Sequence, residues 1–277
     1  MLADLHMHST VSDGWRDPDE VAHLAAEHGV RVMALTDHDA FLGIDAARAV
    51  AHSRGVGYVP ALEVTTYPPN QMRHILGHGV NPQHPQLLAI IQRTQSAFRR
   101  QTQVWIQLLG ELGLGRGLGL EAFAHKPTLM PGAVLKVVLQ HGLMGERQAW
   151  DSVRQATATL PADWDSAVPS PQEAVEAIHA AGGLAVHAHP GSVPDQDLMK
   201  EVLPLVDGLE VYTRRHSPEQ IPIYEALAEK HGLLMTVGTD YHGFNGDGYQ
   251  APKKVIDIRY LEKLGSRIQW PAVEKAG

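Results

Sequence analysis

Two histidines near the start of the chain have a spacing that suits a metal site. His6 and His8 lie in a short apolar run, where alternate strand positions face the same side. Both imidazoles can therefore reach one ion from the end of a single strand. A Thr-Asp-His motif ends the next apolar run at His38, and Asp240-Tyr-His242 repeats the same residue types far downstream. We interpret these groups as ligands of catalytic metal ions.

The composition narrows the choice of metal and of protein class. The chain of 277 residues has no cysteine, which excludes disulfides, thiolate zinc sites and cysteine nucleophiles. Imidazole and carboxylate ligands remain, and they suit Mn, Fe or Zn. The formal net charge of −8 disfavours broad nucleic-acid binding. Because no apolar run could span a bilayer and Met1 leads directly into a strand, we expect a cytoplasmic protein without a signal peptide.

Short apolar runs alternate with helical patterns, which favours an α/β fold with a largely parallel sheet. Helices should start at Asp17-Pro18 and at Ser170-Pro171, where Glu173 completes a capping box. The strands should each end in a polar cluster, as α/β barrels collect catalytic groups. We expect strands at residues 2–7, 30–36, 57–64, 75–77, 184–189, 208–212 and 233–240.

The pattern changes in the middle of the chain, where residues 86–112 and 131–158 have helical periodicity. We expect an inserted helical subdomain over residues 92–169, within a barrel domain that comprises residues 1–91 and 170–277. Three tryptophans of the insert suit either its core or a partner surface: Trp105, Trp150 and Trp164.

Nine histidine and carboxylate groups fall at the ends of the expected strands. Such a cluster is costly to bury unless bound cations compensate its charge. If one carboxylate bridges two ions, the set can hold two or three, and Glu63 suits that role because it follows an apolar strand. The ligand candidates are His6, His8, Asp13, His38, Glu63, His74, His189, Asp240 and His242.

In combination and order, these motifs resemble the PHP (polymerase and histidinol phosphatase) family of metal-dependent phosphoesterases. The resemblance implies a distorted (β/α)7 TIM-like barrel with two to three divalent ions, of which Mn is favoured over Fe and Zn. The insert and the segment 210–220 are most similar to the branch of nucleoside 3',5'-bisphosphate phosphatases and short-RNA 5'-exonucleases. The matching motifs are His6-x-His8, Asp13-Gly14, Thr36-Asp37-His38, Ala188-His189-Pro190-Gly191 and Asp240-x-His242-Gly243.

The resemblance also implies how the ligands divide among the ions. His187 is a rival for His189, although the His-Pro-Gly context favours His189, and His78 is the corresponding rival for His74. The implied sets are His6, His8, Glu63 and Asp240 for the first ion, Glu63, His74 and His189 for the second, and Asp13, His38 and His242 for the third. Two further carboxylates are candidates to orient the ligand imidazoles: Asp37 and Asp39.

Substrate contacts are expected from positively charged groups outside the ligand set. His216 is our candidate for an acid or phosphate ligand that faces the substrate, with Arg214 and Arg215 beside it. Arg99 and Arg100 in the insert suit bidentate contacts to a second phosphate. Relatives often carry Gly-Arg-Pro-His in the insert, where this chain has His125-Lys126-Pro127-Thr128. Lys126 would keep the positive charge, but the imidazole after Pro is missing.

The leading hypothesis is a metal-dependent phosphoesterase that releases the 3'-phosphate of a nucleoside 3',5'-bisphosphate through a metal-activated hydroxide, and that also trims short RNA from the 5' end. Asp13 and His216 are the expected catalytic residues. One alternative is a small-metabolite phosphatase such as histidinol phosphatase, and another is a non-catalytic metal-binding regulatory module. We expect a small phosphorylated substrate, with neither a membrane nor a stable long nucleic-acid partner.

Overall fold

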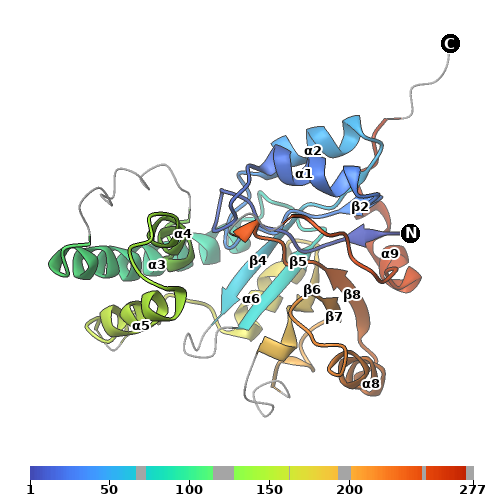
Figure 1. The fold of residues 1–277 in the computed structure, drawn as a ribbon. Helices are drawn as coiled ribbons and strands as arrows, with labels where there is room; N and C mark the ends of the chain where they lie inside the picture. The colour runs from blue at the N-terminus through green and yellow to red at the C-terminus, as the bar shows by residue number, and fades with distance from the viewer. Residues whose placement is uncertain (67–72, 115–127, 162, 193–200, 245–247, 273–277) are drawn as a thin grey trace.

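The computed structural model describes residues 1–66, 73–114, 128–161, 163–192, 201–244 and 248–272 (Figure 1). The strands are β1 (Ala3–Asp4), β2 (Val32–Met33), β3 (Gly57–Tyr58), β4 (Ala61–Thr66), β5 (Arg73–His78), β6 (Leu184–His187), β7 (Gly208–Thr213) and β8 (Leu234–Gly238). The helices are α1 (Pro18–Glu27), α2 (Ile44–Ser53), α3 (Pro85–Glu111), α4 (Pro131–Gln140), α5 (Glu146–Thr157), α6 (Pro171–Ala180), α8 (Ile221–His231) and α9 (Ile258–Leu264), with 3-10 turns at η3 (Pro190–Ser192) and η5 (Gly265–Arg267). None of the helices in these ranges combines the length and apolar character needed to cross a membrane.

The strands form two sheets instead of one closed ladder. The first has the order β1-β2-β3 and is parallel, whereas the second has the order β4-β5-β6-β7-β8 and is mixed. In the second sheet, β5 is antiparallel to both of its neighbours. The connection from β4 to β5 is much shorter than the dozen or so residues that a parallel crossover needs, and this explains the reversal. The α/β class is therefore confirmed, while the closed, mostly parallel (β/α)7 barrel is not.

The two sheets meet at the level of the ligand candidates. Isolated parallel bridges join Met7 to Tyr241 and His38 to Glu63, beyond the regular parts of the strands. The sequence predicts strands over residues 2–7 and 30–36, but β1 and β2 pair regularly over only two residues each. These bridges connect the two sheets at the place where the candidate metal ligands lie.

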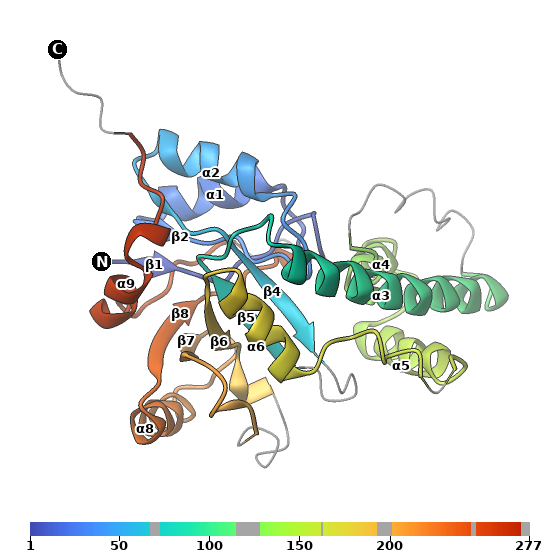
Figure 2. The same cartoon turned by 180° about the vertical axis from the view of Figure 1, so that it is seen from behind.

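Helices cover the outer faces of both sheets and begin where the sequence predicts. In Figure 1, α1 and α2 lie over the first sheet, and in Figure 2, α6 lies in front of the second. At the start of α6, the Glu173 backbone N donates to Ser170 Oγ at 3.2 Å, and the Ser170 backbone N donates to Glu173 Oε2 at 2.9 Å. The predicted capping box is thereby confirmed. Apolar side chains from both sheets, among them Leu5, Leu76 and Val186, fill the space between them.

Helix α3 runs from the sheets into the insert, with 27 residues and two buried stretches. Its first part buries Leu87 and Ile91 in the cluster beneath α6, and its second part buries Trp105 and Leu109 against α4 and α5. Figure 1 shows α3, α4 and α5 projecting away from the sheets. The domain boundaries at residues 92 and 169 stay a prediction.

His78, the rival for His74, has a structural role inside the fold. It is fully buried, its Nε2 donates to the Leu5 carbonyl at 2.8 Å, and its Nδ1 accepts from the Tyr260 hydroxyl at 2.6 Å. Burial lowers the pKa of His78 from 6.5 to about 4, so the imidazole is neutral in the fold. These two bonds occupy both ring nitrogens and leave neither for a metal ion.

The buried His78 should make the fold sensitive to acid. Between pH 6.5 and about 4 the unfolded chain binds the proton more tightly than the fold does, so the free energy of unfolding falls as the pH drops through this window. We expect wild type to lose about 2 kcal/mol more stability than His78→Gln on going from about pH 7 to pH 5. Urea unfolding at both pH values measures this difference, with His231→Gln on the exposed end of α8 as control. Equal losses in wild type and His78→Gln would contradict the assignment.

Candidate metal centre

All nine predicted ligands lie in one cluster where the two sheets meet, with Glu63 at its centre. Glu63 is fully buried, and its Oε2 lies 3.0 Å from both His6 Nε2 and His8 Nε2. Its Oε1 lies 3.0 Å from His74 Nδ1 and 3.1 Å from His189 Nε2. Each carboxylate oxygen thus faces its own pair of imidazoles, which is the arrangement expected of a carboxylate that bridges two ions.

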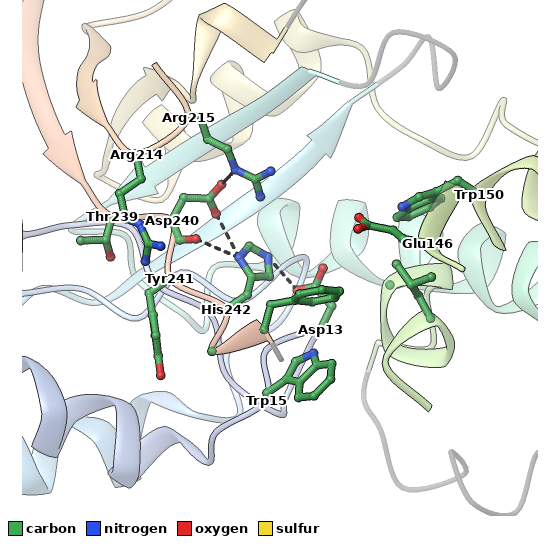
Figure 3. A pocket seen from close by; sticks show the side chains of 14 residues that line it. Asp13, Trp15, Glu146, Trp150, Arg214, Arg215, Thr239, Asp240, Tyr241 and His242 are labelled. Carbon is green, nitrogen blue, oxygen red and sulfur yellow. Dashed lines mark hydrogen bonds and ion pairs between the residues drawn. The ribbon is translucent and has the colours of Figure 1, made fainter. Parts of the chain in front are cut away.

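Asp240 faces the same cluster from the end of β8. Its Oδ1 lies 3.4 Å from His6 Nε2, 3.3 Å from His8 Nε2 and 3.4 Å from His242 Nδ1. Its Oδ2 accepts from Arg215 Nε, as the dashed lines of Figure 3 show. The backbone of Asp240 is in the left-handed region at φ 52°, a conformation that turns the chain at this strand end. One carboxylate therefore connects the metal-ligand cluster to a cationic side chain.

Asp13 gathers a further set of imidazoles at the rim of the cluster. Its Oδ1 lies 3.4 Å from His242 Nε2 and 3.7 Å from His8 Nδ1, and its Oδ2 lies 3.9 Å from His38 Nε2. His38 also approaches Glu63, with 3.5 Å between Nδ1 and Oε2. His8 and His38 are thus each shared between two sets. The sets whose ligand atoms could hold an ion are His8, Asp13, His38 and His242; His6, His8, Glu63 and Asp240; and His38, Glu63 and His74.

The ring nitrogens and carboxylate oxygens of the cluster are better suited to binding divalent cations than to hydrogen bonding with one another. His6 Nε2 and His8 Nε2 lie 3.1 Å apart and converge on the same carboxylate oxygen of Glu63. A single proton can satisfy only one such contact, whereas a cation between the three atoms would satisfy them together. Imidazole and carboxylate donors suit first-row ions. The division of the ligands among the ions stays a prediction, since His8 joins the Asp13 set and His38 joins the Glu63 set.

The carboxylates of the cluster stay ionised although they are buried. Burial opposes the charge on Glu63, but the imidazoles of His6, His38 and His74 outweigh it and hold the pKa of Glu63 well below its usual value. The pKa of Asp240 is likewise held low against burial, first by His6 and His242. Metal ligands must be deprotonated to bind, so both carboxylates are in the form that an ion requires. Glu210 and Glu63 outweigh burial and hold the pKa of His6 well above its usual value, so an ion bound there would have to displace a proton from that imidazole.

Glu210 belongs to the site, although no role was predicted for it. It is fully buried in β7, where its Oε1 accepts from His6 Nδ1 at 2.9 Å and its Oε2 accepts from the His189 backbone N at 2.8 Å. A carboxylate on the far nitrogen of a ligand imidazole fixes the ring orientation and increases its basicity. The signal in the sequence was a charged residue inside an apolar strand.

The two carboxylates predicted to orient imidazoles have other partners within the described residues. Asp37 accepts from Ser9 Oγ and from Ser12 Oγ, both at 2.6 Å, and so fixes the loop that leads to Asp13. Asp39 accepts from the Thr65 backbone N at 3.1 Å. Both carboxylates position backbone segments near the ligands and do not hold the imidazole rings.

His189, and not its rival His187, reaches the cluster. His187 lies on β6, where it pairs with Ile75, and neither of its ring nitrogens has a hydrogen-bond partner in the described part of the chain. His189 follows that strand with a positive φ of 26°, which turns its side chain to Glu63. This backbone turn distinguishes two histidines that a regular strand would have placed on the same face.

A cavity of about 430 Å³ adjoins the metal-ligand cluster (Figure 3). Asp13, Asp240 and His242 form its inner wall, while Arg214 and Arg215 stand at one end. Helices α4 and α5 form the opposite wall. The remaining lining residues are Trp15, Gly132, Leu135, Glu146, Trp150, Thr239, Tyr241, Gly243 and Phe244.

The other predicted substrate residues lie elsewhere. His216 Nδ1 donates to the Val211 carbonyl at 2.9 Å, and its Nε2 accepts from the Gly191 backbone N at 3.0 Å, so neither nitrogen is available to a leaving group in this conformation. Arg100 in α3 is exposed and donates to the Trp164 carbonyl, and neither it nor Arg99 lines the cavity. Lys126 lies outside the described residues.

The insert touches the ligand set directly at Gly132. A Cβ atom at this position would lie 2.8 Å from Asp13 Oδ2 and 3.0 Å from Asp13 Cβ, so an alanine would displace the carboxylate. We expect Gly132→Ala to weaken the binding of an ion at Asp13 roughly 10- to 100-fold, as substitutions behind metal ligands do. Calorimetric titration with Mn measures this. Gly110→Ala in α3 is the matched control, because nothing lies within 4 Å of its Cβ position. Unchanged binding in Gly132→Ala would contradict the prediction that this glycine makes room for the Asp13 carboxylate at an ion.

Comparison with known proteins gives consistent matches over this fold. The PHP domain description matches residues 4–107. The chain is 31% identical to the phosphoribosyl 1,2-cyclic phosphate 1,2-diphosphodiesterase of Eggerthella lenta over 88% of this chain and 95% of the relative. It is 30% identical to the 5'-3' exoribonuclease of Haemophilus influenzae over 86% and 89% of the two chains. It is 29% identical to the 3',5'-nucleoside bisphosphate phosphatase of Chromobacterium violaceum over 86% of each.

A solved structure shares the fold as well. It is described as an amidohydrolase from Chromobacterium violaceum with bound sulfate and no metal, and it matches 98% of this chain and 99% of its own length with a TM-score of 0.78 and 27% identity. The identity of at least 30% to two relatives, over most of each chain, agrees with the ligand motifs and with the matched domain. The chain therefore belongs to the PHP-domain family of metal-dependent phosphoesterases.

Proposed function

We propose that the protein hydrolyses the 3'-phosphate ester of a nucleoside 3',5'-bisphosphate and releases the 5'-monophosphate. The observation that carries this proposal is the cavity, which joins the inner wall of Asp13, Asp240 and His242 to two arginines at one end. A substrate with two phosphates could place one at the ligand cluster and the other near Arg214 or Arg215. The relatives named as a bisphosphate phosphatase and as a 5'-3' exoribonuclease support this class, and trimming of short RNA would use the same cavity.

The residues of the chain divide into those that would hold ions and those that would hold substrate. Glu63, Asp240 and Asp13 each join a set of imidazoles that could hold a divalent ion. Bound ions of this kind lower the pKa of a water molecule and neutralise charge on phosphoryl oxygens. Arg215 is fixed by Asp240 while its side chain remains 52% exposed, so its guanidinium is oriented and still accessible to a phosphate. Arg214 lines the same end of the cavity.

We propose that His216 positions the site and does not transfer protons. Its two hydrogen bonds connect the end of β7 to the turn after His189, and its ring stacks on Tyr224 with 4.4 Å between centroids. Burial lowers the pKa of His216, which favours the neutral ring that these bonds require. The turn that carries His189 is thereby held against β7.

Phosphate release by the Mn-loaded protein tests the proposed reaction. Adenosine 3',5'-bisphosphate should be hydrolysed faster than AMP or 3'-AMP at equal concentration, with AMP as product. Histidinol phosphate, a short 5'-phosphorylated RNA and 5-phosphoribosyl 1,2-cyclic phosphate are the competing substrates, and the last reflects the Eggerthella lenta relative. Chromatography of the products follows the RNA and the cyclic phosphate, because hydrolysis of one phosphodiester bond does not by itself release inorganic phosphate. Faster hydrolysis of histidinol phosphate or of the cyclic phosphate would overturn the proposal in favour of that substrate.

A further inference from the structure

Aromatic side chains form one side of the cavity, and the hydrolysis of a phosphate ester does not by itself require them. Trp15 and Phe244 come from loops that also carry the ligand candidates Asp13 and His242. Trp150 comes from α5 (Figure 3). All three are partly exposed. In contrast, Trp105 is fully buried and Trp164 is 9% exposed, so both belong to the core of the insert. Of the three tryptophans singled out in the sequence, Trp150 alone lines this cavity.

Trp15 and Phe244 are held in place by neighbouring side chains. Trp15 and Phe244 lie 5.2 Å apart between ring centroids at an interplanar angle of 57°. Lys136 of α4 places its Nζ 5.5 Å from the centroid of Trp15, a cation–π contact between the insert and the neighbouring loop. Such contacts reduce the conformational entropy that these side chains would lose when a ligand binds.

The position of the cavity limits what can occupy it. Asp13, Asp240 and His242 belong both to the ligand cluster and to the cavity wall, so a substrate whose phosphate lies at the cluster can place its remaining atoms in this cavity. Its volume of about 430 Å³ suits a small molecule. A phosphate offers no apolar surface to the aromatic side, whereas the flat ring of a base can stack on it.

Charge is also distributed unevenly along the cavity. Figure 3 shows Arg214 and Arg215 at one end, with Glu146 beside Trp150 at the other. A carboxylate repels phosphate and accepts hydrogen bonds from exocyclic amino groups, such as those of adenine and cytosine. The phosphates should therefore lie toward the arginines and an uncharged ring toward Glu146.

We propose that Trp15, Phe244 and Trp150 form a subsite that stacks the nucleobase of the substrate, with Glu146 at its edge. This inference rests on the proposed function and assigns the residues that bind the base of its substrate. Aromatic side chains that stack a base change affinity on the order of 10- to 100-fold. Because Trp150 and Glu146 belong to α5, the insert contributes half of this subsite.

The test compares a substrate with a base and the same substrate without one. The pair is adenosine 3',5'-bisphosphate and its abasic analogue, in which hydrogen replaces adenine at C1' of the sugar. The ratio of kcat/KM for the two compounds should fall roughly 10- to 100-fold in Trp150→Ala, mainly through a higher KM for the adenosine compound. Trp270→Ala is the matched control, because Trp270 is 50% exposed and does not line the cavity. An unchanged ratio in Trp150→Ala and in Trp15→Ala would overturn the subsite.

Binding without turnover separates this inference from the proposed reaction. Calorimetric titration of the Mn-loaded protein with AMP and with ribose 5-phosphate should show tighter binding of AMP, and Trp150→Ala should reduce that preference. If adenosine 3',5'-bisphosphate is not hydrolysed but the preference for AMP is present and depends on Trp150, the reaction fails and the subsite stands. If the bisphosphate is hydrolysed but AMP and ribose 5-phosphate bind equally, the subsite alone fails.

Discussion

Glu63→Gln should reduce kcat/KM for phosphate ester hydrolysis by at least roughly 1,000-fold, because it weakens the metal-assisted stabilisation of the transition state. Such a loss corresponds to three factors of ten, at about 1.4 kcal/mol each. Glutamine keeps the size of the side chain, but it removes the negative charge and replaces one oxygen with an NH2 group that cannot bind a cation. Oε1 and Oε2 of Glu63 face different imidazole pairs, so a single amide removes the carboxylate from two sets at once. In the described cluster, no other carboxylate has imidazole nitrogens this close to both of its oxygens.

Metal content and activity together test the role of Glu63. After dialysis against Mn and removal of free metal, Glu63→Gln should retain fewer ions per chain than wild type. Glu262→Gln, on the exposed side of α9, should retain the wild-type number and activity. A Glu63→Gln variant with the full metal content and activity within tenfold of wild type would exclude a bridging role. Far-ultraviolet circular dichroism verifies that the variant is folded.

Local spacing accounts for part of the candidate ligand cluster. His6 and His8 lie two residues apart on either side of Met7, which forms a bridge to Tyr241, and both side chains approach Glu63. The capping box at Ser170 likewise depends only on residues within one turn of the helix. Features that depend on a few neighbouring residues can be predicted from spacing.

Features that depend on pairing between distant segments were missed. The antiparallel orientation of β5 follows from its short connection to β4, and this reversal prevents a uniformly parallel sheet. Glu210 lies inside β7, so a search of strand ends could not find it, and only the tertiary contact between β7 and the segment that follows β1 brings it to His6. The aromatic side of the cavity joins segments more than a hundred residues apart in sequence, which no local pattern reveals.

Backbone turns account for the remaining differences. A regular strand would direct His187 and His189 to the same face, but the positive φ at His189 separates them. His216 was predicted to face the substrate because it stands beside two arginines. Its side chain instead points back to backbone groups of β7 and of the turn at Gly191. Side-chain direction within loops is set by such tertiary hydrogen bonds and not by residue type.

Asp240→Asn should have the second large effect, again on the order of 1,000-fold in kcat/KM. Oδ1 of Asp240 approaches His6, His8 and His242, and so it joins the first set of ligands to the set around Asp13. Its Oδ2 also orients Arg215, which we propose as a phosphate contact. Asparagine removes the charge from both interactions, and it tolerates the left-handed backbone at this position better than most residues.

The two substitutions should be distinguishable by the ions that they release. Asp240→Asn leaves Glu63 between His74 and His189, so the ion at that set should remain, whereas Glu63→Gln should lose it. Calorimetric titration with Mn resolves the number of sites in each variant, and Asp19→Asn on the exposed face of α1 is the control. The KM for a bisphosphate should also rise in Asp240→Asn, because Arg215 loses its ion-pair partner. If both variants lost the same ions and KM did not change, Asp240 would be an ordinary ligand of a single site, and its connection to the arginine would have no part in substrate binding.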